Sequence, residues 1–506
     1  MTFQQLLDGV EILSLSGNPH VSGIEYDSRR IKPGNVFVAM RGETSDGNSF
    51  IDAALAAGAV AIVTDSAGEK PRPGVSWVQV PHGRRALARL SANFYKRPAE
   101  RLALTGITGT NGKSTTAFLV EAIFAVGGRK SALVGTIEYH VAGEILPAPH
   151  TTPEALDLNR ILNQALGSGA TEAVMEVSSH ALAQQRVYGI PFDVAVFTNL
   201  TRDHLDYHRT MEEYFAAKQI LFEGCGTDAP RVAVLNFDDE HGQKLVKVSG
   251  KRGSQVLTYG LARGDFRAEK MEIIPRGTRF DLATPSATIP LFSPLIGKVN
   301  VYNVLAASAA AYARGCNAEA IARGVEALSR VPGRFERVDC KQPFTVVVDY
   351  AHTDDALRNL TSLAREFVQQ AGQKGRVITV FGCGGDRDRA KRPLMGEAAG
   401  RGSNFVILTS DNPRSEDPLA IINDAMIGLQ RSGVKYKTEP DRKTAIAMAI
   451  AEAGPGDIVL IAGKGHEKVQ VSRQGSVLFD DVEVTRQLLH EAGYGCEEAS
   501  SASGKI

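Results

Sequence analysis

The chain has 506 residues, enough for roughly three domains, and 43% of them are hydrophobic, so it can bury sizeable cores. Its 57 basic and 57 acidic side chains balance, which excludes an overall positive field that would draw it onto nucleic acid or an anionic membrane. The five cysteines are odd in number and widely spaced, which fits neither a disulfide framework nor a zinc motif and favours a reducing cytoplasm.

The first 98 residues are predicted to form a small domain of short strands and helices. Strand patterns cover 36–39 and 59–64, and helical patterns cover 51–58 and 84–95. The chain starts without a basic segment and a long apolar core, and no apolar run reaches the ~18 residues of a membrane span, so neither a signal peptide nor a transmembrane segment is expected. Arg97 and Pro98 mark the first boundary.

The next domain, 99–333, opens on the most informative segment of the chain, the loop GITGTNGKS at 106–114. An apolar strand precedes this loop and a helical pattern, 115–126, follows it. Backbone N–H groups of such a turn can approach phosphates, Lys113 can add a positive charge, and the Ser114 hydroxyl can ligate Mg²⁺. The strict phosphate-loop pattern has a glycine where this chain has Ile107, so the loop is a variant. The alternative is an ordinary glycine-rich turn with a solvated lysine.

Short apolar runs alternate with helical patterns through the rest of this domain. This alternation predicts an α/β fold with a mostly parallel sheet and helices on both faces. The predicted strands are 101–108, 173–177, 194–198 and 232–236, an antiparallel β insertion is predicted at 267–293, and helices are predicted at 301–314 and 318–328.

A hinge is predicted at 331–334, and a C-terminal domain extends from there to residue 506. Its apolar runs alternate with helical stretches, which is the doubly wound pattern that binds ligands at the carboxyl ends of its strands. These runs are 345–349, 377–381, 405–409 and 458–462.

Polar residues follow directly after the predicted strands of both larger domains. Because ligands bind at this edge of parallel sheets, the recurrence favours a site shared by these loops. The loops are 178–180, 199–206, 349–352, 382–389, 411–414 and 463–467.

Two candidates for metal binding have structural alternatives. Glu176 lies inside a buried run, where a lone carboxylate is costly, so it needs either Mg²⁺ or a salt bridge to a core arginine. His204 lies in a cluster with Asp203, Asp206 and His208, which fits either a metal site or the capped start of a helix.

Two cationic candidates have alternatives as well. Apolar neighbours of Lys218 on a predicted helix would desolvate its amine, but the residues alone favour a surface lysine whose stem lies along the protein. Arg414 ends the sequence Asp-Asn-Pro-Arg after a strand. Its guanidinium could hold a carboxylate bidentately, or Arg414 could be solvated beside a turn that Asp411 caps.

Taken together, these motifs resemble the Mur ligases of bacterial cell-wall synthesis over nearly the whole chain, from Asp27-Ser-Arg29 to the loop at 463–467. The resemblance implies an N-terminal domain (1–98) for the UDP end of the substrate, a central P-loop ATPase (99–333) and a C-terminal Rossmann-like domain (334–506) for an amino acid. It implies an ATP-dependent acid–amino-acid ligase that uses Mg²⁺, ATP, UDP-N-acetylmuramoyl-L-Ala-D-Glu and meso-2,6-diaminopimelate. A cytoplasmic monomer without nucleic-acid or membrane partners is expected.

The resemblance also implies roles for individual residues. The ATP contacts it implies are Gly109, Thr110, Asn111, Gly112, Lys113, Ser114, Thr115, Asn303, Arg334 and Asp349. The contacts to the UDP-linked dipeptide are Ser28, Glu43, Thr44, Ser45, Thr151, Thr152, Ser178, Gln184 and Arg186. The amino-acid contacts are Arg387, Asp411, Asn412, Pro413, Arg414, Gly463 and Glu467. The metal ligands are Ser114, Glu176, His204 and Lys218, the last as a carbamate (N6-carboxylysine), and the catalytic group is Lys113, Lys218, Glu176 and His204.

The resemblance thus reverses the interpretation of Lys218 as a surface residue. The Asp-Asn-Pro-Arg form is associated with diaminopimelate rather than L-lysine, because Arg414 can pair with the second carboxylate that lysine lacks. The chain departs from the family at Asp354, where proline is usual. The alternatives are an L-lysine-adding ligase, a folylpolyglutamate synthase-like ligase and, from another class, a P-loop regulatory NTPase.

Overall fold

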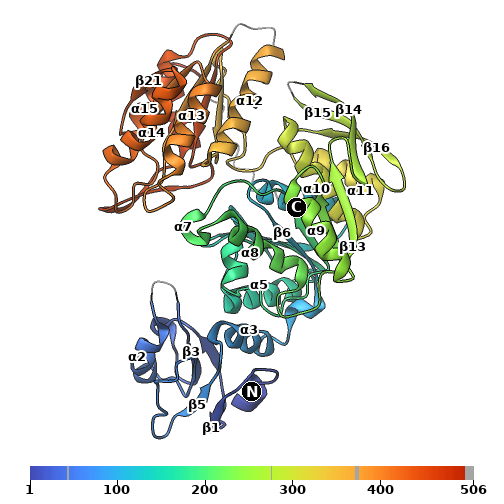
Figure 1. Cartoon of the computed structure of the whole chain (residues 1–506), viewed down its shortest axis with the longest axis vertical. Helices are drawn as coiled ribbons and strands as arrows, with labels where there is room; N and C mark the ends of the chain where they lie inside the picture. The colour runs from blue at the N-terminus through green and yellow to red at the C-terminus, as the bar shows by residue number, and fades with distance from the viewer. Residues whose placement is uncertain (43–44, 275, 371–374, 496–506) are drawn as a thin grey trace.

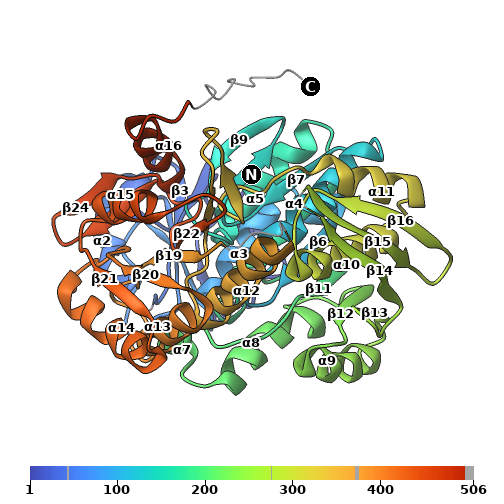
Figure 2. The same cartoon turned by 90° about the horizontal axis from the view of Figure 1, so that it is seen from above.

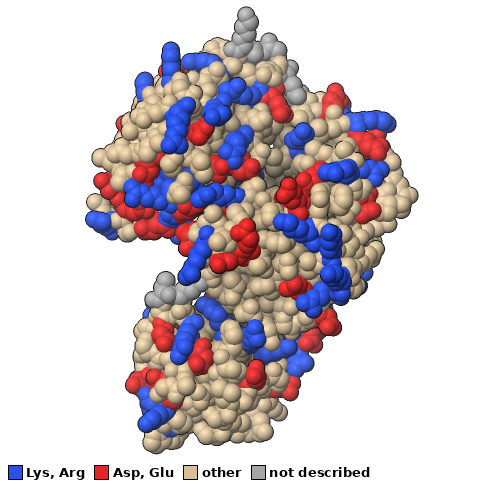
Figure 3. Space-filling view, viewed as in Figure 1, with Lys and Arg blue, Asp and Glu red and all other residues tan. Residues whose placement is uncertain are grey.

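The computed structural model describes residues 1–42, 45–274, 276–370 and 375–495. The chain forms three lobes along its long axis, each built around its own sheet (Figure 1). The N-terminal lobe lies at one end and the C-terminal lobe at the other. The space-filling view shows the surface hollowed between the N-terminal lobe and the other two, with basic and acidic side chains intermixed over this face (Figure 3). Within the described residues, no helix is both long and apolar enough to span a membrane.

The N-terminal lobe contains a sheet of order β1-β5-β4-β3-β2, in which β1 pairs antiparallel and the other pairs are parallel. The inner strand β3 is buried along its whole length because both faces of the sheet are covered. The elements are α1 (Phe3–Leu6), β1 (Ser14–Ser16), β2 (Gly23–Glu25), η1 (Ser28–Arg30), β3 (Asn35–Ala39), η2 (Gly47–Phe50), α2 (Ile51–Ala56), β4 (Ala61–Thr64), β5 (Ser76–Gln79), α3 (Gly83–Phe94) and η3 (Pro98–Arg101).

The central lobe contains a sheet of order β16-β15-β14-β13-β12-β11-β6-β10-β7-β8-β9. Its strands are β6 (Ala103–Thr108), β7 (Ser131–Val134), β8 (Glu138–Val141), β9 (Glu144–Pro147), β10 (Glu172–Glu176), β11 (Val194–Phe197), β12 (Val232–Asn236), β13 (Gln255–Gly260), β14 (Phe266–Ile274), β15 (Gly277–Ala283) and β16 (Thr288–Ser293). The strands from β7 to β14 in this order pair in parallel. This confirms the predicted mostly parallel α/β sheet.

Two hydrophobic cores enclose this sheet, because successive side chains of a strand point to opposite faces. In β12, Val232 and Val234 pack in the core beneath α4, α10 and α11, whereas Ala233 and Leu235 pack in the core beneath α5 and α8. The helices of the lobe are α4 (Lys113–Val126), α5 (Ala155–Gly167), α6 (Ser179–Ala183), α7 (Leu205–His208), α8 (Met211–Glu223), α9 (Glu240–Lys251), α10 (Lys298–Ala313) and α11 (Ala318–Ala327).

Antiparallel strands extend the central sheet at both edges. At one edge β14, β15 and β16 pair antiparallel, which confirms the insertion predicted at 267–293. At the other edge β7, β8 and β9 also pair antiparallel. The sequence analysis did not predict this second extension, whose three strands are four residues long each.

The C-terminal lobe contains a sheet of order β17-β18-β22-β19-β20-β21, parallel except for β17. Helices α12, α13 and α14 cover one face of the sheet and α15 and α16 cover the other (Figure 2), which confirms the doubly wound prediction. The elements are β17 (Glu336–Val338), β18 (Thr345–Asp349), α12 (Asp354–Gln370), β19 (Val377–Phe381), α13 (Lys391–Gly402), β20 (Phe405–Leu408), α14 (Pro418–Ser432), β21 (Lys435–Thr438), α15 (Arg442–Glu452), β22 (Ile458–Ala462), β23 (Val469–Ser472), β24 (Gly475–Leu478) and α16 (Asp481–Glu491).

The ends of α14 illustrate how local sequence sets these elements. Asp417 caps the helix by accepting a hydrogen bond from the backbone N–H of Leu419, and Pro418 occupies the first turn, where no N–H is needed. Gly433 ends the helix in the left-handed conformation at φ 72°. The helix therefore begins and ends where its sequence provides capping residues.

A fully buried ion pair, Arg442–Asp481, lies under the ligand edge of the C-terminal sheet. Arg442 donates to both Asp481 carboxylate oxygens at 2.8 and 2.7 Å and to the carbonyl oxygens of Ser410 and Ala462. Arg442 thus fixes the ends of two strands.

We expect Arg442→Met to lower the free energy of unfolding by about 3–5 kcal/mol, because it leaves the buried Asp481 carboxylate unpaired. Urea unfolding monitored by circular dichroism measures this change. Arg431→Met, on the exposed side of α14, serves as the control and should change stability by less than about 0.5 kcal/mol. Equal effects of the two substitutions would contradict the prediction.

The cysteines differ in part from the sequence analysis. Cys225, Cys316 and Cys383 are buried free thiols. Cys340 is disulfide-bonded, which the cysteine spacing did not predict.

Candidate active site

A cavity of about 480 Å³ lies between the central and C-terminal lobes. It gathers the loops that follow β6, β10, β11 and β18, as expected for parallel sheets that present ligand sites at the carboxyl ends of their strands. Sixteen of the predicted site residues line it: Thr110, Asn111, Gly112, Lys113, Ser114, Thr115, Thr151, Thr152, Glu176, Ser178, Arg186, His204, Asn303, Arg334, Asp349 and Arg387.

Two glycines of the loop at 106–114 occupy positions that no other residue fits. Gly109 has φ 146°, and a Cβ there would lie 1.8 Å from Oγ1 of Thr198. Gly112 has φ 87°, and a Cβ there would lie 2.4 Å from Oδ1 of Asn303. The loop therefore stays close to its neighbours and leaves its N–H groups at the start of α4 for a ligand.

Lys113 is the first residue of α4 and is half-buried, so the alternative of a freely solvated lysine does not apply. Its Nζ donates to the carbonyl oxygens of Gly109 at 3.1 Å and Thr110 at 2.8 Å. Burial lowers the pKa of Lys113, and the negative charge of Glu176 opposes that shift.

Lys218 lies behind the same loop rather than in the cavity lining. Only 1% of its surface is exposed, so the interpretation of a surface lysine, favoured on the residues alone, was wrong. Its Nζ donates to the Gly109 carbonyl at 2.8 Å and lies 4.4 Å from the centre of the Tyr214 ring. Burial, together with the nearby charge of Lys113, holds the pKa of Lys218 well below its usual value.

Glu176 ends β10 with 1% of its surface exposed. Its two carboxylate oxygens accept hydrogen bonds from the N–H of Thr136 at 2.8 Å and the hydroxyl of Thr136 at 2.9 Å. Among the described residues Glu176 forms no salt bridge, so the alternative of a core arginine partner is not realised. Thr136 was missed by the sequence analysis, because β7, the strand that places it, was not predicted.

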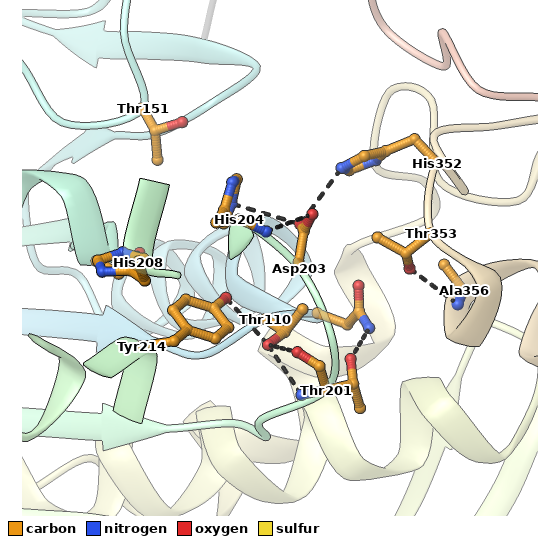
Figure 4. Close-up of polar contacts among 12 residues, drawn as sticks. Thr110, Thr151, Thr201, Asp203, His204, His208, Tyr214, His352, Thr353 and Ala356 are labelled. Carbon is orange, nitrogen blue, oxygen red and sulfur yellow. Dashed lines mark hydrogen bonds and ion pairs between the residues drawn. The ribbon is translucent and has the colours of Figure 1, made fainter. Parts of the chain in front are cut away.

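His204 and Asp203 form a polar cluster that reaches the C-terminal lobe (Figure 4). The His204 ring nitrogen Nε2 lies 3.4 Å from Asp203 Oδ2, which also lies 3.7 Å from Nε2 of His352. Desolvation lowers the pKa of His204 to about 3, so its imidazole is neutral near pH 7 and keeps a lone pair for a metal.

Asp203 does not cap the following helix, because His204 is the N-cap of α7 and makes no side-chain cap bond. Instead, Asp203 lies 3.6 Å from Nζ of Lys391 in the C-terminal lobe. Although burial opposes its ionisation, His352 and neighbouring cationic groups such as Lys391 hold the pKa of Asp203 well below its usual value. Asp203 therefore connects the central lobe to the C-terminal lobe. The sequence placed Asp203 in a polar cluster with His204 but did not predict this contact.

The chain after the hinge also contributes to the cavity. Arg334 donates to the Ser114 hydroxyl at 3.3 Å and stacks 4.7 Å from the centre of the Tyr350 ring. Asp349 accepts hydrogen bonds from the N–H groups of Phe335 at 2.7 Å and Ala351 at 2.8 Å. Burial raises the pKa of Asp349.

The residues predicted to contact the dipeptide end of the substrate form one hydrogen-bonded group. Thr152 donates to the Glu176 carbonyl at 2.8 Å and accepts from the N–H of Ser178 at 3.1 Å. Arg186 donates to the side chain of Gln184 and to the Thr152 carbonyl. These side chains therefore share one wall next to Glu176.

The residues predicted for the UDP end lie in the N-terminal lobe, outside the cavity lining. Ser28 begins η1, which Asp27 caps, and Asp27 also pairs with Arg29 at 2.7 Å. Ser45 is exposed. Glu43 and Thr44 lie outside the described residues.

The predicted amino-acid contacts gather where β19, β20 and β22 end. The side chain of Asn412 donates to Glu467 Oε2 at 2.7 Å, and a Cβ on Gly463 would lie 2.5 Å from Asp411 Oδ2. Arg414, at φ 52°, donates to the Gly385 carbonyl at 2.7 Å. Because Arg414 is half-buried and bonded to a neighbouring loop, the alternative of a solvated turn does not apply. The carbonyl oxygen of Pro413 lies close to Gly385. Arg387 lines the cavity, whereas the other predicted amino-acid contacts do not.

The donors predicted for Mg²⁺ differ in how they lie around the cavity. Ser114, Glu176 and His204 line one cavity and supply a hydroxyl, a carboxylate and a neutral imidazole. No group of three His, Cys, Asp or Glu side chains that could hold a metal occurs among the described residues. The set therefore fits an ion that takes its other ligands from nucleotide phosphates and water, as Mg²⁺ does.

Comparison with known protein families matches three consecutive parts of the chain. The N-terminal part, 20–95, matches the Mur ligase family catalytic domain; 107–311 matches the Mur ligase middle domain; and 333–465 matches the Mur ligase glutamate ligase domain.

Individual proteins are similar over nearly the full length. A protein of Solibacter usitatus named UDP-N-acetylmuramoyl-L-alanyl-D-glutamate–2,6-diaminopimelate ligase is 54% identical, covering 94% of each chain. A solved structure with the same enzyme name is 35% identical, with a TM-score of 0.67 over 98% of this chain and 99% of that one. The MurF ligase of Thermotoga maritima in complex with ADP shares the fold at 20% identity, with a TM-score of 0.64 over 93% of this chain and 97% of that one.

Proposed function

Since the chain belongs to the Mur ligase family, we propose that it joins meso-2,6-diaminopimelate to the D-glutamate γ-carboxylate of UDP-N-acetylmuramoyl-L-Ala-D-Glu. It is an ATP-dependent ligase of peptidoglycan synthesis. The observation that carries the proposal is the 54% identity to a diaminopimelate ligase over 94% of both chains. The gathering of the loop at 106–114, Glu176 and most of the predicted dipeptide contacts around one interlobe cavity, which Arg387 also lines, supports it.

The reaction must make a carboxylate reactive toward an amine. The γ-carboxylate attacks the terminal phosphorus of ATP, so that ADP leaves and an acyl phosphate forms. The amine then attacks the acyl carbon, the carbon–oxygen bond to phosphate breaks, and phosphate and a proton are released. The enzyme aligns the partners and stabilises the transferring phosphoryl group.

In the proposal, different groups of residues bind ATP, the dipeptide and the UDP end of the substrate. The N–H groups at the start of α4 and the Lys113 ammonium hold the ATP phosphates, with Asn303, Arg334 and Asp349 around the nucleotide. Thr151, Thr152, Ser178, Gln184 and Arg186 hold the dipeptide, and Ser28 and Ser45 contact its UDP end. Residues 1–98, 99–333 and 334–506 form the corresponding three domains.

Ser114, Glu176 and His204 would hold Mg²⁺, together with a carbamate on Lys218. When bound, the ion neutralises phosphate charge and acts as a Lewis acid on the transferring group. Glu176 is kept in place for this role by its two hydrogen bonds to Thr136. The enzyme is further proposed to be a cytoplasmic monomer that binds neither nucleic acid nor membranes.

The test is phosphate release by the purified chain with ATP, Mg²⁺ and UDP-N-acetylmuramoyl-L-Ala-D-Glu. Addition of meso-diaminopimelate should start release and yield a tripeptide product by mass spectrometry, whereas L-lysine should be used far less. Preferred use of lysine would favour a lysine-adding ligase, and glutamate addition to a folate would favour a folylpolyglutamate synthase. Slow ATP hydrolysis that no amino acid stimulates would identify a regulatory NTPase and reject the proposal.

Arg414→Ala should reduce kcat/KM for diaminopimelate roughly 100-fold while leaving the low activity with lysine nearly unchanged, because a charge-assisted pair with the second carboxylate is lost. Steady-state assays with both amino acids measure the two values.

Arg473→Ala is the matched control, because Arg473 is exposed and donates to the nearby Ser415 carbonyl. It should leave both values within about twofold. A parallel fall with both amino acids in Arg414→Ala would remove the basis for selectivity.

A further inference from the structure

Lys464 carries a charged group into the core of the C-terminal lobe. It follows β22 directly, and none of its surface is exposed. An ammonium group at such a position is costly unless hydrogen bonds replace its water. Lys464 meets that condition, because its Nζ donates to Asn412 Oδ1 at 3.1 Å, Glu467 Oε2 at 3.2 Å and the Val469 carbonyl at 2.6 Å. Neither the sequence analysis nor the proposed reaction gives it a role.

These three contacts join two separate segments around the predicted amino-acid pocket. Asn412 lies in the loop after β20, whereas Glu467 and Val469 lie between the end of β22 and the start of β23, in the stretch that contains Lys464 itself. The segments are also joined directly, since the Asn412 amide donates to Glu467 Oε2 at 2.7 Å and accepts from the N–H of Val471 at 2.9 Å. Lys464 therefore lies at the centre of a closed hydrogen-bond network.

The network fixes the direction of the Glu467 carboxylate. Oε2 accepts from both Lys464 and Asn412, whereas Oε1 accepts no hydrogen bond within the described part of the chain. The Glu467 side chain is 28% exposed, while that of Lys464 is fully buried. Oε2 is thus fixed by two donors, and Oε1 remains able to accept a hydrogen bond from an ammonium group of a diamino acid.

We propose that Lys464 is a positioning residue for amino-acid binding, which acts through Glu467 and Asn412 without touching the substrate. The inference rests on the proposed function, because it assumes that these two residues bind the incoming amino acid. Loss of the ammonium removes one of the two donors to Glu467 Oε2 and leaves the Val469 carbonyl without this partner. The pocket then loses its fixed arrangement, and binding of the diamino acid must restore it at a cost in affinity.

The neighbouring Lys468 provides a matched control. It belongs to the same segment, but its side chain is 65% exposed and pairs with Asp480 away from Asn412 and Glu467. Lys464→Met should raise KM for diaminopimelate roughly 10- to 100-fold, the size expected for hydrogen bonds to charged groups. It should leave KM for ATP and for the UDP-linked dipeptide within about twofold. Lys468→Met should leave all three values within about twofold.

A double-mutant cycle with Glu467→Gln separates positioning from a general loss of structure. If Lys464 acts through Glu467, adding Lys464→Met to Glu467→Gln should raise KM for diaminopimelate little further. An unchanged KM in a folded Lys464→Met variant, a common rise in all three KM values, or fully multiplicative effects would each overturn the inference. Should Lys464→Met be insoluble, Lys464→Gln, which keeps an amide donor without the charge, enters the same cycle. Absence of diaminopimelate-dependent phosphate release in the unsubstituted enzyme would instead reject the proposed function.

Discussion

Replacing Lys113 with alanine should abolish ligation, with kcat/KM falling about a thousandfold or more. The ammonium is the positive side chain that the phosphate loop places at the start of α4. Loss of one preorganised charge that stabilises a transferring group typically costs at least 100-fold. In the proposed site the same charge also contributes to binding the triphosphate, so the two losses combine. ADP release in the presence of all three substrates measures the effect.

The substitution should leave the fold intact, because Lys113 is half-buried and its present partners are two loop carbonyls. Circular dichroism and the thermal unfolding midpoint check this point. Lys247→Ala, on the exposed side of α9, should retain full activity. If Lys113→Ala turned over normally, the loop at 106–114 would not be the nucleotide site.

The strand, loop and helix around 106–114 were predictable because their signals are local. An apolar strand, the glycines and the Lys-Ser pair lie within one short stretch, and Gly109 and Gly112 adopt the positive φ that favours glycine. The strands of the central and C-terminal sheets were predictable for a similar reason. Val232 to Asn236, for example, is an uninterrupted apolar run of the kind that parallel sheets bury on both faces.

Residues whose role depends on distant parts of the chain were harder to predict. Lys218 shows an ordinary helical context, with the Tyr214 ring one turn before it on α8. The Gly109 carbonyl that its Nζ contacts comes from 109 residues away and is brought to it by tertiary packing. Thr136 and Lys464 were missed because each contacts a residue far along the chain: Glu176 lies 40 residues from Thr136, and Asn412 lies 52 residues from Lys464. Only the family resemblance pointed to Lys218, and nothing in the local pattern pointed to the other two.

The departure from the family at Asp354 has a local explanation in the structure. Asp354 is the first residue of α12, where proline is favourable because no N–H is needed. A carboxylate also suits this end of a helix, because it interacts favourably with the helix dipole. Asp354 in addition accepts a hydrogen bond from Arg358 at 2.5 Å, one turn along. Asp349 and His352, which precede Asp354, both line the cavity, so aspartate in place of proline is compatible with this wall of the cavity.

Replacing Lys218 with alanine should reduce activity at least about 100-fold, and short carboxylates such as acetate should restore part of it. The pKa of the buried amine is held well below its usual value, which favours the neutral form that can attack CO₂. A nitrogen–carbon bond forms, a proton is released, and the resulting carbamate is an anion. Alanine leaves a space in which an added carboxylate can supply the same charge.

Lys218→Arg separates this explanation from simple loss of packing, because arginine fills the space but keeps a positive charge and forms no carbamate. It should be inactive and should not respond to acetate. Enzyme equilibrated with ¹³C-bicarbonate should show a carbamate carbon resonance that both variants lack. Rescue of neither variant, together with no such resonance in the unsubstituted enzyme, would leave Lys218 as a lysine that supports the Gly109 carbonyl from behind. Among the proposed metal ligands, Glu176 alone would then supply a negative charge.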